Sequence, residues 1–203
     1  MAIKAVIFDI GGVLLVNDGR EQTQKPDSQA KVQMDEIFKF INRSGIGISA
    51  TKGQLSVQEL WSQVGERFKV DPQQIQALEA EAIVTERLNT ELAEFLQSLR
   101  PHYKTALLSN AWPGARASLN AKYALDKLAD MQFFSSEEGK MKPDANFYLI
   151  ALMRLRIQAN EAVFLDDKIV NVDGASVLGM NSIQYRNNEQ AMADIKRVLD
   201  RYR

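Results

Sequence analysis

The chain has 203 residues, of which 45% are hydrophobic and 25% charged, and its formal net charge is −1. This length and composition predict one folded domain, or one domain with a large insertion, and argue against disorder. A net charge this small gives no general attraction for nucleic acid or an anionic membrane surface, so any anion site must be local. Cysteine is absent, which excludes disulfides and thiolate metal sites. Because the N-terminus lacks a signal peptide's cleavage site and no apolar run reaches about 18 residues, we expect a soluble cytoplasmic protein without a membrane partner.

An apolar run near the N-terminus predicts the first strand of a parallel sheet. The segment from Ile3 to Leu15 reads IKAVIFDIGGVLL, and its apolar run stops at Asp9, shortly before Gly11 and Gly12. A run without a polar break is typical of a strand buried on both faces in an α/β protein. Asp9 would then lie at the carboxyl end of the strand, where open α/β sheets bind ligands. Taken alone, Asp followed by two glycines is as typical of an ordinary turn.

The next part of the chain is predicted to be an inserted helical subdomain. Apolar residues recur there at helical spacing, a capping box begins at Ser56, and we find no strand signal between Arg20 and Asn89. We therefore expect an α/β core over residues 1–16 and 89–203 and a helical cap over residues 17–88. The cap elements expected are a helix over Gln29–Ile41, a glycine-containing link over Ser44–Thr51, a helix after Ser56, and a helix whose N-cap is Asp71 before Pro72.

From Asn89 onward strands and helices alternate, as expected of an α/β domain. The expected strands are Lys104–Ser109, Met131–Phe134, Ala162–Leu165 and Ser182–Tyr185. The expected helices are one capped by Thr90, Pro113–Tyr123, one capped by Asp144, Val170–Leu178 and Asn188–Tyr202.

Three further polar stretches fall at the expected strand ends or nearby. Ser109 and Asn110 follow the second core strand, where a hydroxyl and amides can hold the oxygens of an anion or simply cap a helix. Lys142, before Pro143, can neutralise an anion or be a solvated loop lysine. Asp166 and Asp167 close an apolar strand; adjacent carboxylates repel each other and suit Mg²⁺, although a helix cap beside a surface Asp is the simpler alternative.

Together these residues resemble the haloacid dehalogenase-like (HAD) hydrolase superfamily, with the inserted segment similar to its small helical (C1) cap. The resemblance covers essentially the whole chain and implies a Rossmann-like parallel sheet and Mg²⁺-dependent phosphoryl transfer through an aspartyl-phosphate. It implies that Asp9 is the nucleophile and that Lys142 neutralises Asp9 and the transferring group. Ser109, with Asn110, Gly11 and Gly12, would bind substrate. The implied Mg²⁺ ligands are Asp9, the Gly11 carbonyl, Asp166 and Asp167.

The sequence departs from that family's usual pattern at Gly11. The common motif has there a second aspartate, which protonates the leaving group and later activates water, so Gly11 removes a group that is typically worth about 10² to 10⁴ in rate. Activity is therefore expected to be weak or to favour good leaving groups, unless another group such as Asp18 substitutes.

Three functions remain open on the sequence. The first is a Mg²⁺-dependent phosphatase for a small phosphomonoester, such as a sugar phosphate or nucleotide. The second is a metal-independent 2-haloacid dehalogenase, against which the Asp166–Asp167 pair argues. The third is a non-catalytic binding protein that has lost the acid at Gly11. Neither the substrate nor the oligomeric state follows from the sequence.

Overall fold

A computed structural model describes residues 2–17, 36–37, 39–41, 43–70 and 86–202. The expected helices over Gln29–Ile41 and after Asp71 fall largely or wholly outside these residues, as does Asp18. Within the described ranges, no helix is long and apolar enough to cross a membrane.

The centre of the molecule is a five-stranded sheet in which all neighbouring strands are parallel. The first strand in the sequence lies in the middle, with Ala5 paired with Lys104 on one side and with Ala162 on the other. This fold confirms the predicted α/β class with a Rossmann-like parallel sheet. In spatial order the strands are β5 (Met131–Phe134), β4 (Lys104–Ser109), β1 (Ala5–Phe8), β6 (Ala162–Asp166) and β7 (Asn181–Gln184).

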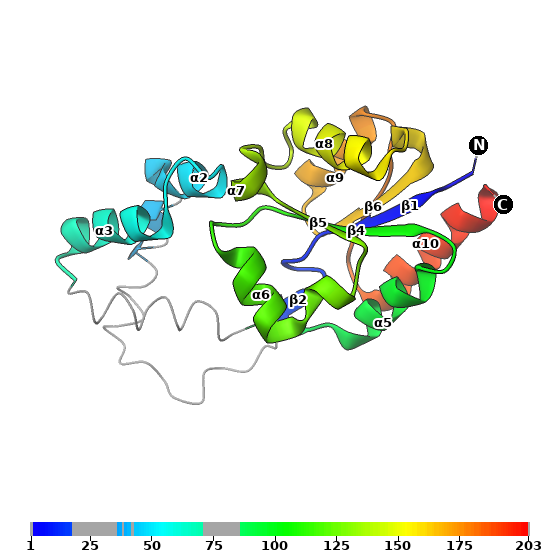
Figure 1. Ribbon diagram of the computed structural model, residues 1–203, viewed down its shortest axis with the longest axis horizontal. Coiled ribbons are helices and arrows are strands. Elements are labelled where there is room, and N and C mark those ends of the chain that lie inside the picture. The colour runs from blue at the N-terminus through cyan, green and yellow to red at the C-terminus, as the bar shows by residue number, and fades with distance from the viewer. Residues whose placement is uncertain (1, 18–35, 38, 42, 71–85, 203) are drawn as a thin grey trace.

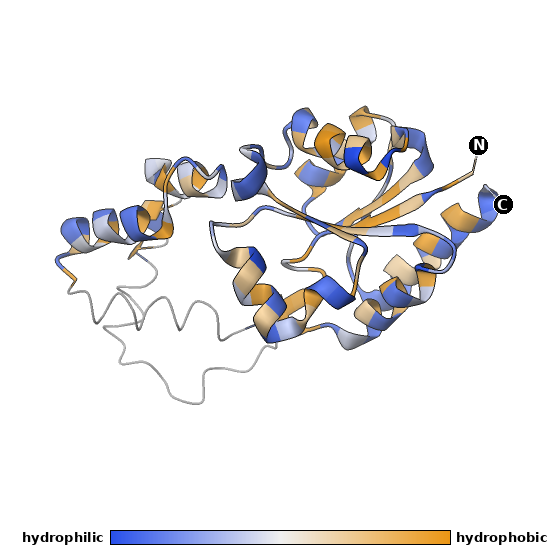
Figure 2. Cartoon of the chain, viewed as in Figure 1, coloured by the Kyte–Doolittle hydropathy of each residue, from blue (hydrophilic) through white to orange (hydrophobic). Residues whose placement is uncertain are grey.

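Helices cover both faces of the sheet, and successive residues of β1 serve the two faces in turn. Val6 and Phe8 pack into one apolar cluster with helices α5 (Thr90–Leu99) and α10 (Asn188–Arg201). Ala5 and Ile7 pack into a second cluster with helices α8 (Ala145–Leu155) and α9 (Ile169–Val177). Figure 1 shows the two helix pairs on opposite sides of the sheet, and Figure 2 shows the apolar strands between them. Burial on both faces explains why the strands read as apolar runs without alternation. The helices of this core are α5 (Thr90–Leu99), α6 (Ala115–Tyr123), α7 (Ser135–Glu138), α8 (Ala145–Leu155), α9 (Ile169–Val177) and α10 (Asn188–Arg201), with short 3-10 turns at Leu125–Lys127 and Ala159–Glu161.

Most predicted core elements are confirmed to within a residue or two at each end, but the cap of α5 was misassigned. The N-cap is Asn89, whose Oδ1 accepts the Leu92 N–H, and Thr90 is the first helical residue. Asn is at least as good a cap as Thr. The Asn89 amide also donates to the Val13 carbonyl and to Asn188, which fixes it at this position. The four-residue helix α7 was not predicted.

The inserted segment contains strand structure that the sequence did not indicate. β2 (Leu15–Asn17) and β3 (Glu86–Leu88) pair antiparallel, so the expectation of no strand between Arg20 and Asn89 was wrong. Strands of three residues are too short to show a period, and their pairing partners are far apart in the sequence.

The expected link over Ser44–Thr51 is instead a helix, α2 (Ile46–Thr51). Gly45 begins it with a φ of 81°, and Gly47 lies inside it, where an added Cβ would be 2.8 Å from an Ile41 methyl carbon. The glycines therefore permit close packing and do not interrupt the helix.

α2 and α3 (Val57–Phe68) form a small apolar cluster of their own with Ile37 and Ile41, to one side of the sheet in Figure 1. The predicted capping box is confirmed, since the Ser56 Oγ accepts the Glu59 N–H and the Glu59 carboxylate accepts the Ser56 N–H. An edge-on contact between Trp61 of α3 and Trp112, with ring centres 6.4 Å apart, joins this cluster to the loop that follows β4.

Candidate active site

Asp9 stands at the carboxyl end of β1, in the middle of the sheet. Its amide donates to the Leu165 carbonyl at 2.8 Å, which continues the β1–β6 ladder by one residue and fixes the start of the loop. Its Oδ1 accepts the Ile10 N–H at 2.6 Å. Among the described residues no hydrogen bond reaches the other oxygen, Oδ2. The carboxylate is thus held on one side and available on the other, although it is buried.

Lys142 reaches Asp9 from the loop between α7 and α8. Its Nζ lies 2.8 Å from Asp9 Oδ1 and 2.7 Å from Asp166 Oδ2, and the side chain is 1% exposed. Asn110 holds the lysine's backbone at both ends, because its Oδ1 accepts the Lys142 N–H at 2.8 Å and its Nδ2 donates to the Lys142 carbonyl at 2.9 Å. A cis peptide bond joins Lys142 to Pro143. The ammonium is therefore a positioned structural charge and not a solvated one.

Asp166, at the end of β6, is fully buried and its oxygens are well supplied with donors. Besides Lys142, the Lys168 N–H donates to Oδ1 at 2.8 Å, and Asn171 Nδ2 lies 3.0 and 3.1 Å from the two oxygens. Charge-assisted hydrogen bonds of this kind fix the orientation of a carboxylate.

Asp167, the next residue, lacks such hydrogen-bond donors on one of its oxygens. Its Oδ1 is buried and has no hydrogen-bond partner, the sole such side-chain atom in the described part of the chain. The carboxylate lies against Gly12, where an added Cβ would be 2.6 Å from Oδ2, and Gly12 has a φ of 78°. Burying a carboxylate oxygen without a hydrogen-bond donor costs free energy, and a bound cation would remove that cost.

One oxygen from each of Asp9, Asp166 and Asp167 can be chosen so that all three lie within 4.8 Å of one another. At an effective dielectric constant of about 20, two full charges at that separation repel by roughly 3 kcal/mol. Burial raises the pKa of the Asp9 carboxyl to about 7, against the lowering effect of Lys142 and with a further rise from Asp166. Burial, and then the charge of Asp166, also raise the pKa of Asp167.

These residues fit a divalent cation. The cluster offers hard carboxylate oxygens, which are the ligands that Mg²⁺ prefers, and it contains an unpartnered buried oxygen. The Gly11 carbonyl oxygen is a further available ligand for the cation, since no described backbone hydrogen bond ends on it.

Ser109 ends β4, next to β1, and is 5% exposed. No described hydrogen bond uses its hydroxyl, which leaves it free to contact an anion. The loop that follows is fixed by Ser135, whose Oγ accepts the Ala111 N–H at 2.9 Å and donates to the Ala111 carbonyl at 3.2 Å.

Two residues predicted to bind substrate have other partners here. The Asn110 side chain uses its oxygen and its nitrogen on the Lys142 backbone, and the Gly12 N–H donates to the Leu15 carbonyl at 2.8 Å. Asn110 therefore positions the lysine, and Gly12 makes room for Asp167. Their contact with a substrate stays a prediction.

Sequence reasoning missed two supporting residues, Asn171 and Ser135. The sequence offered a reason to expect a hydrogen-bonding role for Asn171. It lies in the first turn of α9, and Asn is a poor helix former. For Ser135 the sequence offered none, because a Ser after a strand is common.

Comparison with known proteins identifies the family of the chain. Residues 3–179 match the model of the haloacid dehalogenase-like hydrolase family. The chain is 25% identical over 198 residues to the sesquiterpene phosphatase astK of Aspergillus oryzae, covering 97% of this chain and 96% of that protein. It is 21% identical over 204 residues to D-ribitol-5-phosphate phosphatase of Bacteroides thetaiotaomicron, covering 98% and 99%. It spans only 19% of acyl-CoA dehydrogenase family member 10 of Mus musculus, to which it is 29% identical over 206 residues.

Solved structures show the same fold. A HAD family enzyme from Bacteroides thetaiotaomicron, in complex with magnesium and inorganic phosphate, superposes with a TM-score of 0.74 at 22% identity, covering 91% of this chain and 95% of that one. A 2-haloacid dehalogenase from Pseudomonas syringae superposes with a TM-score of 0.65 at 19% identity, covering 99% and 100%.

Proposed function

Given that the chain belongs to the haloacid dehalogenase-like hydrolase family, we propose that it is a Mg²⁺-dependent phosphatase that hydrolyses a small phosphomonoester with Asp9 as nucleophile. The observation that carries the proposal is the unpartnered buried oxygen of Asp167 within a cluster of three carboxylates. Two relatives covered over nearly their full length are phosphatases by name, and a similar structure holds magnesium and phosphate, which supports the same chemistry here. We propose that the protein acts in the cytoplasm on a small phosphorylated substrate.

The residues of the site would divide metal binding and catalysis among them. Asp9, Asp166, Asp167 and the Gly11 carbonyl would hold Mg²⁺, which when bound neutralises charge on the carboxylates and on the phosphoryl oxygens. Lys142 opposes the rise that burial causes in the Asp9 pKa and orients the carboxylate through its contact with Oδ1, which leaves Oδ2 to attack the substrate.

Ser109 would donate its hydroxyl to a phosphoryl oxygen. The Asp9 oxygen would then form a bond to phosphorus while the bond from phosphorus to the ester oxygen breaks, and the leaving alkoxide takes a proton from water because Gly11 supplies none. A water molecule would later attack phosphorus and break the bond to Asp9, which releases phosphate and restores the carboxylate. Splitting the hydrolysis in this way replaces one hard step by two easier ones.

The dehalogenase alternative has structural neighbours in its favour, but the site opposes it. A halogenated acid is itself an anion, and without a metal ion it would meet three carboxylates and only one lysine ion-paired with two of them. The non-catalytic alternative follows from Gly11, and it leaves the buried and oriented Asp9 and Lys142 without a role.

A screen of phosphomonoesters with and without Mg²⁺ tests the proposal. We expect turnover that a chelator abolishes and Mg²⁺ restores, and that Asp9→Asn eliminates while thermal unfolding shows an intact fold. Asp126→Asn, at an exposed position outside the site, serves as the matched control and should retain full turnover. Chelator-resistant turnover of a 2-haloacid would favour the dehalogenase, and full activity of Asp9→Asn would remove Asp9 from the nucleophile role.

A further inference from the structure

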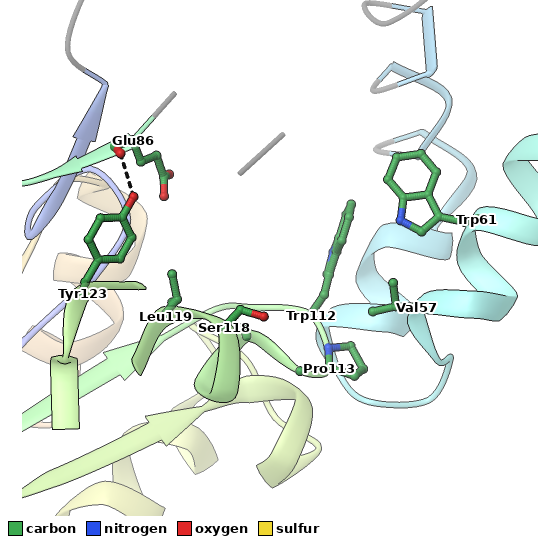
Figure 3. A pocket seen from close by; sticks show the side chains of 10 residues that line it. Val57, Trp61, Glu86, Trp112, Pro113, Ser118, Leu119 and Tyr123 are labelled. Atoms are coloured by element: carbon green, nitrogen blue, oxygen red, sulfur yellow. Dashed lines mark hydrogen bonds between the residues drawn. The ribbon is translucent and has the colours of Figure 1, made fainter. Parts of the chain in front are cut away.

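A cavity of about 390 Å³ lies between α3 and the core, against the loop that follows β4. That volume is within the range of small-molecule pockets, about 300 to 1,000 Å³. Its walls come from α3, from β3, and from the loop and helix that follow β4. Figure 3 shows Trp112 on one side of the open space, Tyr123 and Glu86 on the other, and Leu119 and Ser118 between them.

The walls of this cavity are mainly apolar and aromatic. Both tryptophans of the chain, Trp61 and Trp112, line it, together with Val57, Pro113 and Leu119. The Tyr123 hydroxyl is already engaged, since it donates to the Glu86 carbonyl at 2.6 Å. Few polar groups are therefore left to bind a polyhydroxylated ligand.

Glu86 is the one charged side chain among the described lining residues. Partial burial raises the pKa of its carboxyl above the ordinary value, with an opposing effect from Lys122. An acidic side chain on the wall, with no basic side chain among the described lining residues, disfavours a ligand that carries a second phosphate or a nucleotide's phosphate chain.

Chain connectivity places the cavity beside the catalytic residues. Trp112 is three residues after Ser109, so their Cα atoms are at most about 11 Å apart. The intervening turn is fixed by the two hydrogen bonds of Ser135 to Ala111. On the opposite wall, Glu86 pairs with Asn17 at the end of the loop and strand that lead away from Asp9. One molecule can thus have a phosphate at Asp9 and a side group in the cavity.

We propose, on the basis of the proposed phosphatase function, that this cavity binds an uncharged, mainly apolar group of the substrate, such as an aromatic ring or a branched hydrocarbon. The substrate is then an apolar phosphomonoester, and not the sugar phosphate or nucleotide expected from the sequence. Trp112 and Leu119 supply contact area, and Glu86 excludes further negative charge.

The test compares two esters with leaving groups of the same type, 3-phenylpropyl phosphate and propyl phosphate, in the presence of Mg²⁺. Both release a primary alcohol, so a difference in kcat/KM reports binding of the ring and not leaving-group chemistry. We expect a ratio of about 10 to 100 in favour of the phenylpropyl ester, the factor that burial of an aromatic ring supplies. Ribose 5-phosphate should react more slowly than either ester.

Variants localise the effect. Trp112→Ala should bring the ratio of the two esters close to one, and Leu119→Ala should lower it several-fold. The matched control is Leu149→Ala, on the exposed face of α8, where the side chain is 48% exposed and does not line the cavity; it should keep the full ratio. A ratio near one in the unaltered protein, or a preference for ribose 5-phosphate, would overturn the inference.

A binding measurement separates this inference from the phosphatase proposal. Because both tryptophans line the cavity, 3-phenylpropanol, which has no phosphate, should quench tryptophan fluorescence saturably in the presence of a chelator, whereas glycerol should not. Saturable quenching without hydrolysis of any ester would refute the phosphatase but support an apolar ligand for the cavity. Hydrolysis without quenching and with a ratio near one would leave the phosphatase standing and refute the apolar group.

Discussion

Replacing Gly11 by aspartate should raise the rate of phosphate-ester hydrolysis, because the structure has room for the side chain. An ideal Cβ at Gly11 meets no heavy atom within 4 Å, and Gly11 is not among the glycines with positive φ. An aspartate can therefore be added without steric strain. The new carboxyl group can supply the proton that the leaving alcohol lacks, an effect worth about 10² to 10⁴ in rate.

The gain should depend on the leaving group. For propyl phosphate, whose alkoxide is a poor leaving group, kcat/KM should rise toward that range, whereas for 4-nitrophenyl phosphate it should change little. The assay is steady-state hydrolysis of both esters at saturating Mg²⁺, because a fourth carboxylate would otherwise add repulsion to the cluster. Gly11→Asn has the same shape without the acid and should show no gain.

Gly12→Ala is the contrasting variant at the neighbouring position. Its Cβ would lie 2.6 Å from Asp167 Oδ2 and the residue would have to keep a φ of 78°, so it should lose activity. Equal acceleration of both esters by Gly11→Asp, or equal effects of Gly11→Asp and Gly11→Asn, would refute the assignment of a missing acid to this position.

Three further outcomes follow from the same structure. Mg²⁺ at 100 times its Kd should stabilise the fold by about 2.7 kcal/mol, seen as a higher Tm, and Asp167→Asn should remove most of that shift; an unchanged Tm would count against a metal site here. Asn171→Ala removes the amide that orients Asp166, so calorimetric titration should find Mg²⁺ binding about 10- to 100-fold weaker. Burial acts to raise the pKa of Asp130, but the hydrogen bonds from Thr105 and Arg100 outweigh this effect, so that the pKa lies below its usual 3.8. The stability that this carboxylate contributes is therefore present above about pH 4 and lost as the pH falls through its lower folded-state pKa, so Asp130→Asn should lower Tm at pH 7 and have little effect near pH 2; a pH-independent difference would contradict this.

The core fold was predictable because burial on both faces produces long apolar runs. The strands from Lys104 to Ser109 and from Met131 to Phe134 were predicted to the residue. Their carboxyl ends, and hence the gathering of Asp9, Ser109 and Asp166 at one edge of the sheet, followed from the parallel topology. The capping box at Ser56 was equally predictable from the sequence.

What could not be predicted depends on contacts between distant segments. The pairing of Leu15–Asn17 with Glu86–Leu88 joins two short runs that carry no period of their own. The role of Asn110 depends on where a loop 32 residues away places Lys142. The apolar cavity depends on the contact between Trp61 of α3 and Trp112 of the loop after β4, which helix patterning does not specify. The sequence alone therefore indicated the family and left the substrate open.

We propose that Asp9 accepts a phosphoryl group in a Mg²⁺-dependent step. The most direct measurement is mass spectrometry of the protein quenched in acid during turnover of 4-nitrophenyl phosphate, followed by peptide mapping. We predict one added phosphoryl group on the peptide that contains Asp9, present with Mg²⁺ and absent with a chelator or in Asp9→Asn. Steady turnover with no phosphoryl group on that peptide, or the same labelling in Asp9→Asn, would contradict the account.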